Sequence, residues 1–545
     1  MNPDQFKHLR TRRDFIRQAS CAAVGTVALT NTIRDLRLIN AAVAQTGLTG
    51  TSPYKALVCI FLGGGNDANN WIVPTDTATY NQYTAIRQNL TLPKTSLLDL
   101  FKADGTTPYT DLAGHTYGFH PACPQLQTLF TEGKLATVFN VGTLVRPTTR
   151  TQYLANTSFY TPPQLFSHSD QVTQWQTSIP DAPPTTGWGG RVADLLSAAA
   201  NGATPKISMN VSVNGSNTFE VGNLVSQYQV STNGAISATG NLMTGNTNNA
   251  RIRALKSILG LPSTNLQRTA YGSVMNSAIT IADLLNTNNA GTQDPTDSPN
   301  SYAAQAAAPW RWNTGLTGIY TIAAPGSAPA TPPSDTSKWP TGTNGGFPNT
   351  TLGTQLKMVA RLIAARGPTA FNMTRQIFFC GVGGYDTHTS QVSVNGTDQP
   401  TNANGAHYKL LNEVSMCMFA FQRAMEQLGL GNQVTTFTAS DFSRTLPTNS
   451  QGSDHGWGSH HLVMGGAVNP NQLKRTYGAL PTFALNGPDD TGLGRWIPSL
   501  AVDQYSATLA KWFGVDVSNL AAVFPNLSRF AGTPSGSDIG FMGPP

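Results

Sequence analysis

Continuous apolar runs that stop at glycines mark the N-terminal part of the chain. Residues 55–62, KALVCIFL, form such a run, and glycines 63–65 follow it directly. A buried parallel strand that ends in a loop has this pattern, because both of its faces are covered. A second such run spans residues 134–141, and residues 121–130 between the two runs are typical of a short helix.

A second block, residues 351–530, alternates helix and strand patterns. Apolar residues recur at helical spacing over residues 352–365 and again over the longer stretch 407–430. Residues 375–380 and 433–439 are strand-like runs that each lead into a polar loop. This order predicts βαβ units, and hence an α/β fold with a largely parallel central sheet and helices on both faces.

The segment between the two blocks has a different composition. Residues 195–350 are rich in Asn, Thr, Gly, Ser and Ala, with one helix-like piece at about residues 251–286. We expect a loop-rich polar insertion or cap at about 195–350 within one domain that spans residues 45–530. Residues 531–545 are expected to be a flexible C-terminal tail.

The first 44 residues have the pattern of a twin-arginine (Tat) signal peptide. Arg12 and Arg13 precede Phe15 and Ile16, an uncharged stretch covers residues 19–30, and Ala42-Val43-Ala44 is a cleavage signal. The uncharged stretch is too short to span a bilayer core of ~30 Å, and no other segment predicts a transmembrane anchor. The pattern therefore predicts folded export to the periplasm or the medium, with the Tat translocase as a partner.

Removing this leader changes the charge of the chain. The whole chain has a formal net charge of +6. Residues 1–44 hold seven basic and three acidic side chains and so account for most of that excess. The remainder is close to neutral, which argues against nucleic acid as a partner. Four cysteines remain after the leader, and their apolar surroundings favour buried free thiols: Cys59, Cys123, Cys380 and Cys417.

Three predicted strands run into loops that carry an aspartate: Asp67, Asp386 and Asp441. The carboxyl ends of parallel strands meet at one edge of a sheet, where ligands gather. Carboxylates brought together there repel one another unless a cation lies between them. We therefore expect a metal site at this edge.

Histidines accompany these aspartates: His388 follows Asp386, His455 follows Asp454, and His460 and His461 lie a few residues later. Mixed Asp and His ligands suit Zn²⁺, Mn²⁺ or Fe²⁺, as one ion or as a pair ~3.5–4 Å apart. Neighbouring side chains diverge, so only one of the last two histidines is a candidate, and we choose His461. His168, His115 and His120 are expected to be structural.

Simpler explanations exist for several of these residues. Asp67 could form an Asx turn after the glycines, and Asp386 could cap the loop that carries His388. Both alternatives stay open from the sequence alone.

The order of motifs resembles that of a Tat-exported family, domain of unknown function 1501. The motifs are Leu62-Gly-Gly-Gly-Asn-Asp67, Phe119-His120-Pro121, Ser167-His168-Ser169-Asp170-Gln171, Gly187-Trp188-Gly-Gly-Arg191, Tyr385-Asp386-Thr-His388, Ser440-Asp441-Phe-Ser-Arg444, Asp454-His455-Gly456 and the closing segment from Trp496 to Asn526. The resemblance implies the alkaline-phosphatase/sulfatase-like superfamily, with a metal site at the strand ends. It also implies an exported partner protein encoded nearby.

Carried over residue by residue, the resemblance assigns metal-binding roles to Asp67 and to Asp386 with His388. Its adjacent Asp-His pair corresponds either to Asp454 and His455, or to Asp441 as the carboxylate with Asp454 and His455 as later ligands. A superfamily nucleophile at a helix start corresponds to Ser167, whose alternative role is an N-cap. The Cys-x-Pro-x-Arg element of classical sulfatases is absent.

Two functions are consistent with these patterns. The first is an exported metal-dependent hydrolase of phosphate or sulfate esters. The second is a non-catalytic exported binding or assembly protein on a degenerate phosphatase-like fold.

Overall fold

The computed structural model is described here over part of the chain. The described residues are 48–155, 158–232, 234–235, 254, 257–259, 261, 347–367, 371–394, 397–398, 400–401, 403, 405–471 and 473–544. The predicted leader, residues 1–44, lies outside them, as does nearly all of the helix expected at 251–286. Within the described part, no helix combines the length and the apolar character that crossing a bilayer requires.

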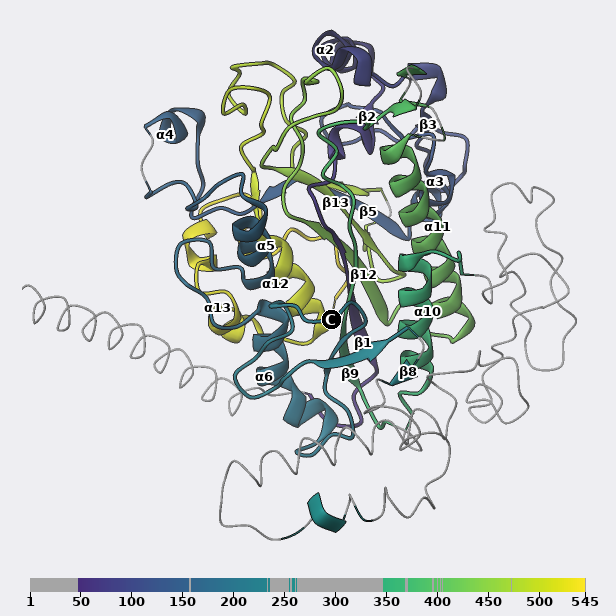
Figure 1. Cartoon of the computed structure of the whole chain (residues 1–545), viewed down its shortest axis with the longest axis vertical. Helices are drawn as coiled ribbons and strands as arrows, with labels where there is room; N and C mark the ends of the chain where they lie inside the picture. The colour runs from purple at the N-terminus through teal and green to yellow at the C-terminus, as the bar shows by residue number, and fades with distance from the viewer. Residues whose placement is uncertain are drawn as a thin grey trace, which may run out of the picture.

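One large sheet forms the centre of the molecule (Figure 1). Its strands follow the spatial order β14 (Thr476–Tyr477), β5 (Leu135–Gly142), β13 (Ser459–Met464), β12 (Val434–Ser440), β1 (Lys55–Leu62), β9 (Arg375–Val382), β6 (Asn210–Ser212), β7 (Tyr228–Ser231) and β8 (Gly234–Ala235), while β15 (Leu500–Ala501) pairs with β5. Two smaller sheets join β2 (Ile72–Pro74), β4 (Tyr117–Phe119) and β3 (Leu98–Asp99), and β10 (Ser393–Val394) with β11 (Thr397–Asp398).

The sheet is mostly parallel. β1 lies between β12 and β9 and is parallel to both, and seven of its eight residues are buried. β13 is the main exception, because it runs antiparallel to β12 on one side and to β5 on the other. The α/β fold with a large, mostly parallel central sheet, predicted from the sequence, is therefore confirmed.

Helices cover both faces of this sheet (Figure 1). One face carries α3 (Pro124–Thr131), α10 (Thr351–Ala364) and α11 (Ala406–Gln427), and the other carries α5 (His168–Thr177), α6 (Trp188–Asn201), α12 (Val502–Phe513) and α13 (Leu520–Val523). Two further helices, α2 (Thr77–Arg87) and α4 (Arg150–Leu154), lie at the periphery. Local signals set the helix starts: Pro124 is the first residue of α3, and the Thr350 side chain accepts a hydrogen bond from Gly353 N.

The strands and helices predicted in the two blocks are all present, with ends that differ by at most a few residues. The predicted run 55–62 matches β1, and the run 433–439 matches β12 shifted by one residue. The four cysteines are buried and free, as expected from their apolar neighbours.

Two predicted boundaries differ from the structure. The first part of the expected insertion, residues 195–235, belongs to the main domain, because α6 packs on the sheet and β6 pairs with β9. The C-terminal segment 531–544 is not a loose tail: Phe541 is buried against Tyr477 and Tyr505, and Gly543 N donates to Ala467 O. A polar-rich stretch with one well-placed aromatic residue can pack, which composition alone does not reveal.

Candidate functional site

The site lies where three neighbouring strands end. β12, β1 and β9 are adjacent and parallel, so the loops after Ser440, Leu62 and Val382 emerge side by side. Gly64 in the loop after β1 has a φ of 115°, and a Cβ there would lie 2.4 Å from Asp386 N. This close approach requires glycine and brings the loops after β1 and β9 into contact.

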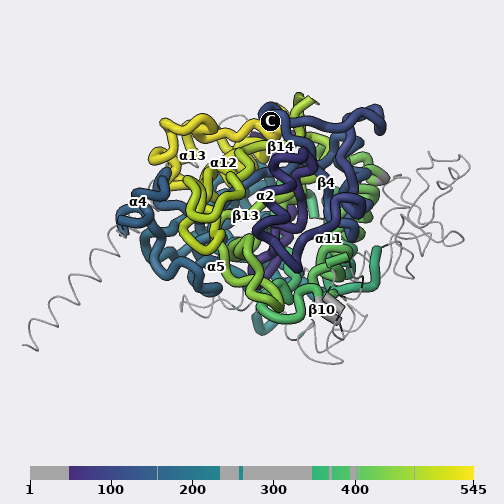
Figure 2. Tube along the Cα trace, turned by 90° about the horizontal axis from the view of Figure 1, so that it is seen from above, coloured from purple at the N-terminus to yellow at the C-terminus, as the bar shows by residue number. Residues whose placement is uncertain are grey.

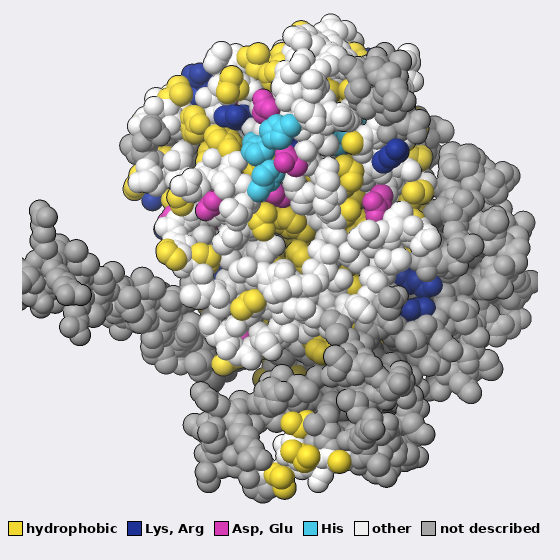
Figure 3. Space-filling view, in the orientation of Figure 1, with side chains coloured by type: hydrophobic (Ala, Val, Ile, Leu, Met, Phe, Trp, Pro, Cys, Tyr) yellow, Lys and Arg dark blue, Asp and Glu magenta, His cyan; other side chains and the backbone are white. Residues whose placement is uncertain are grey.

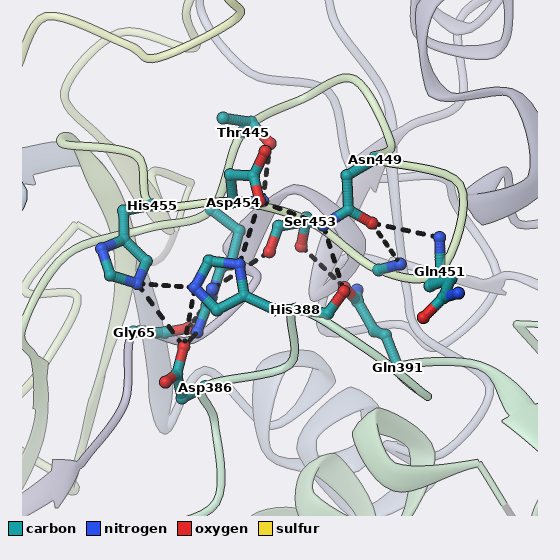
Figure 4. A network of polar contacts seen from close by, with 12 residues as sticks. Gly65, Asp386, His388, Gln391, Thr445, Asn449, Gln451, Ser453, Asp454 and His455 are labelled. Carbon is teal, nitrogen blue, oxygen red and sulfur yellow. Dashed lines mark hydrogen bonds and ion pairs between the residues drawn. The ribbon is translucent and has the colours of Figure 1, made fainter.

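Asp386 is the centre of a group of three imidazoles. Its Oδ1 lies 3.2 Å from His388 Nε2 and 3.5 Å from His455 Nε2, and its Oδ2 lies 3.6 Å from His168 Nε2. Figure 4 shows the rings of His388 and His455 facing each other above the carboxylate. One ligand atom from each of His168, Asp386 and His455 lies within 4.8 Å of the other two.

Each of the three rings is held through its other nitrogen. His168 Nδ1 lies 2.7 Å from Asp441 Oδ2, and His388 Nδ1 lies 2.9 Å from Asp454 Oδ1. His455 Nδ1 lies 2.8 Å from the carbonyl oxygen of Phe166. Ionised carboxylates and carbonyls only accept hydrogen bonds, so each Nδ1 carries a proton and donates it. The lone pairs of the three Nε2 atoms are thereby aimed at Asp386.

With the proton on Nδ1, none of the three Nε2 atoms can donate a hydrogen bond. His388 Nε2 and His455 Nε2 are only 2.8 Å apart, which places two lone pairs face to face unless a cation or a proton lies between them. His168 Nε2 is buried and has no hydrogen-bond partner among the described residues. Both features are typical of rings that are ready to coordinate a cation.

Burial and nearby charges shift the pKa values of Asp386 and His455. Burial alone would raise the pKa of Asp386, but the hydrogen bond and charge of Arg444, with smaller contributions from His168 and His388, lower it. Burial lowers the pKa of His455, and the nearby charge of Arg444 lowers it further. At neutral pH the carboxylate is therefore ionised and the His455 ring is neutral.

Asp67 does not join this group. It is fully buried and forms an ion pair with Arg87, and it also accepts a hydrogen bond from Gln391 Nε2. Arg87 in turn donates to the carbonyls of Thr445 and Leu446, beyond the end of β12. Figure 2 shows α2, which carries Arg87, close to this part of the chain. The contacts give Asp67 a role in fixing the loop after β12.

Two other predicted residues have partners outside the group around Asp386. Ser167 is the N-cap of α5, and its hydroxyl donates to Asp170 Oδ2 at 2.6 Å. His461 is buried in β13, where its ring centre is 4.7 Å from that of Trp175. The structure thus brings together Asp386, His388, Asp441, Asp454 and His455 from the predicted set, with Asp441 and Asp454 as the partners of the rings.

The sequence interpretation missed His168 and the arginines. His168 was expected to be structural, yet its Nε2 faces Asp386. The available signal was its place at the start of a helix, directly after the predicted Ser167. Arg444 is fully buried, and its guanidinium contacts Asp386 and the carbonyls of Gly64 and Gly65. Its place four residues after β12 was the only hint.

Comparison with known proteins adds one match. The model of the family described as "Protein of unknown function (DUF1501)" matches residues 325–521. This segment holds Asp386, His388, Asp441, Asp454 and His455, and it supports the resemblance stated from the motifs. No curated protein and no solved structure matches the chain.

Proposed function

We propose that this chain is a metal-dependent hydrolase whose ion is held by His168, Asp386 and His455. One observation carries the proposal: three imidazoles, each held at Nδ1 by an oxygen acceptor, direct their Nε2 atoms at a single carboxylate. Two nitrogens and one carboxylate suit Zn²⁺, Mn²⁺ or Fe²⁺. Three protein ligands also leave room for a water or a substrate, as in catalytic sites.

The charge balance supports one ion rather than two. Asp67 is already neutralised by Arg87, and Asp386 is partly neutralised by Arg444. Asp441 and Asp454 each accept a hydrogen bond from an imidazole N–H instead of facing Asp386 directly. Each of these four carboxylates is thus engaged with a guanidinium or a ring N–H group, while Asp67 Oδ1 is buried without a hydrogen-bond partner among the described residues.

His388 is the best candidate for the general base. Its ring is 40% exposed, more than that of His455 at 20%, and its Nε2 lies on the edge of the ligand group. Asp454 fixes its orientation, and Asn449 donates to the same Asp454 oxygen at 3.0 Å. An ion held by His168, Asp386 and His455 would supply a Lewis acid for a bound ester and for water. His388 Nε2 would accept the proton of the attacking water as its oxygen bonds to phosphorus or sulfur, and it would return that proton to the ester oxygen whose bond breaks.

The proposed substrates are phosphoric or sulfuric esters, and the proposed fold family is alkaline-phosphatase-like. The support is the motif order together with a site at the carboxyl ends of parallel strands. Because Ser167 is engaged with Asp170, we favour water over this serine as the nucleophile.

A second function is favoured by two residues that do not have the roles the phosphatase-like pattern gives them. An ion-paired Asp67 and an engaged Ser167 would also suit a non-catalytic exported binding or assembly protein on a degenerate phosphatase-like fold. That alternative predicts a stoichiometric exported partner, recoverable from the periplasm, and no turnover.

We also propose that the chain is exported folded, to the periplasm or the medium. The support is the Arg12-Arg13 pattern with its cleavage signal. The Tat translocase is the partner that this pattern implies.

Elemental analysis combined with turnover of aryl phosphates and aryl sulfates tests the proposal. We expect one equivalent of Zn, Mn or Fe, lost in His168→Ala and in His455→Ala. His388→Gln should keep the metal and lower turnover by about 10²–10⁴-fold, the usual contribution of a general base. A protein that binds no metal would refute the site. Metal binding without turnover of either ester would favour the non-catalytic alternative, and loss of metal in His388→Gln would make His388 a ligand.

A further inference from the structure

Arg495 lies beside the ligand group, which is formed by His168, Asp386 and His455. Its side chain is held in place at Nε, while its two terminal nitrogens are free of hydrogen bonds to the described residues. Arg495 Nε donates to the backbone carbonyl of His455 at 2.8 Å. Its guanidinium carbon lies 4.3 Å from the centre of the Phe166 ring, and the carbonyl of Phe166 is the group that anchors His455 Nδ1. Arg495 therefore rests on both members of the Phe166–His455 pair.

The backbone of Arg495 is held as firmly as its side chain. Its N–H donates to Asp490 Oδ1 at 3.0 Å, and its carbonyl accepts from Thr491 N at 3.0 Å. Asp490 is buried and receives a further bond from Gly492 N. A ligand that binds Arg495 would not have to order this side chain first, so little affinity would be lost to conformational entropy.

The two terminal nitrogens of Arg495 have no hydrogen-bond or ion-pair partner in the described part of the chain, and the charge of Arg495 lowers the pKa of the nearby Asp454. The residue is half-buried, and neither terminal nitrogen is among the buried side-chain atoms without a partner. The other arginines near the site differ. Arg87 and Arg444 are fully buried and bound to carboxylates and carbonyls, and Arg150 donates from a terminal nitrogen to Asn486.

Figure 3 shows histidine and acidic side chains grouped on one face, with a cationic side chain close beside them. An arginine anchored at Nε presents its two terminal nitrogens as a fork that matches two oxygens of a tetrahedral anion. Such a pre-positioned cation next to a ligand group is suited to hold the charged end of a substrate.

We propose that Arg495 binds the oxyanion of the substrate, a phosphoryl or sulfuryl group, next to His455. This inference rests on the proposed function, and it names the part of the substrate that the chain recognises. It adds a binding residue that lies outside the candidate site residues predicted from the sequence motifs.

Titration of inorganic phosphate and, separately, of sulfate into the full chain tests the role of Arg495. Each titration is run on protein loaded with Zn²⁺ and on metal-free protein. We expect Arg495→Met to weaken binding of the preferred anion by about 10- to 100-fold, the equivalent of one charge-assisted contact. Zn²⁺ stoichiometry should not change. Arg495→Lys should be intermediate, because it keeps the charge and loses the fork.

Arg150→Met is the matched control. Arg150 bonds to the same loop, through Asp490 O, without touching His455, so its removal should leave anion affinity unchanged. Equal anion affinity in Arg495→Met and wild type would overturn the proposal, and so would a wild type that binds neither anion. If Arg495→Met loses Zn²⁺ together with the anion, Arg495 positions His455 instead, which also overturns it. A wild type that binds no Zn²⁺ but binds an anion through Arg495 would refute the metal site and leave this inference standing.

Discussion

At the scale of single residues, the candidate site depends on what holds the far side of each imidazole. A neutral histidine can carry its proton on either nitrogen, and only the acceptor at Nδ1 decides which one faces the ligand group. Asp441 makes that choice for His168, and Asp454 makes it for His388. Asp441 and Asp454, both predicted as metal ligands, thus orient the imidazoles instead.

Replacing Asp441 tests this assignment. Asp441→Asn removes the charge that fixes His168 Nδ1–H, and partners of this kind typically contribute 10- to 100-fold in metal affinity. We expect a loss of that size in Zn²⁺ affinity, measured by competition with a chelator. Asp170→Asn is the control, because the Asp170 carboxylate accepts hydrogen bonds from Ser167 and Ser169 and from no imidazole in the described part of the chain. Unchanged affinity in Asp441→Asn would contradict the assignment.

Replacing Asp67 tests whether this residue stabilises the fold and does not bind the metal ion. Its ion pair with Arg87 is completely buried, and removing one partner of such a pair costs about 3–5 kcal/mol. We expect Asp67→Asn to lose about that much free energy of unfolding while it still binds one metal ion. Denaturant unfolding and elemental analysis measure the two effects. Asp99→Asn makes the same change at an exposed position and should cost less than about 0.5 kcal/mol. Loss of metal without loss of stability would restore Asp67 as a ligand.

At the scale of elements, the sequence predicted what local pattern controls. Apolar runs that end at glycine gave β1 and β5, and helical spacing gave α10 and α11. The placement of Asp386 and Asp441 at one edge also followed, since neighbouring parallel strands end together. β13 was not predicted, because its run Ser459–Met464 begins with a polar residue and two histidines.

The side-chain geometry of the site could not be predicted in the same way. Whether Asp67 faces Arg87 or Asp386 depends on where α2 packs, which is a tertiary contact with no local pattern. His168 reaches the site because α5 packs against β12. Phe166, whose carbonyl orients His455, has a φ of 75°, a conformation that a bulky residue rarely adopts and that sequence does not indicate.

The two histidines of β13 predict an acid-sensitive fold. Burial lowers the pKa of His460 and of His461 to about 3, so both are neutral in the folded chain. The unfolded chain takes up these protons below about pH 6.5. The contribution of these neutral rings to the free energy of unfolding is therefore complete above about pH 6.5, and it is lost as the pH falls toward 3. At pH 5 each histidine lowers the free energy of unfolding by about 2 kcal/mol.

Urea unfolding of wild type and His461→Phe at pH 7.5 and pH 5 measures this effect. Phenylalanine keeps an aromatic ring against Trp175 and Tyr505, and it cannot be protonated. We expect the variant to lose less stability than wild type between the two pH values. Trp175→Phe changes the packing at the same place without removing a titrating group, so its loss between the two values should equal that of wild type. An unchanged pH dependence in His461→Phe would rule out this explanation.

At the scale of the whole molecule, the topology sets when the site can form. The central strand β1 pairs with β12, so Ala56 lies beside Val434 although most of the chain separates them in sequence. His168 is 218 residues before Asp386, and Asp386 is 69 residues before His455, so the three meet only when the sheet is complete. The proposed ion site is therefore complete only after synthesis and folding. If the site binds an ion in the cytoplasm and the chain leaves folded, as we propose, we expect the ion to travel with it.

Changing the two leader arginines tests this coupling between export and metal loading. Lysine keeps the charge of arginine and lacks its planar guanidinium, so a receptor that reads the arginine pair should reject Arg12→Lys with Arg13→Lys. We expect this double variant to accumulate folded and metal-loaded in the cytoplasm, measured by fractionation followed by elemental analysis of the purified protein. Arg34→Lys with Arg37→Lys is the matched control and should be exported normally. Normal export of the first variant would exclude the Tat route, and retained protein without metal would mean that the ion is acquired after export.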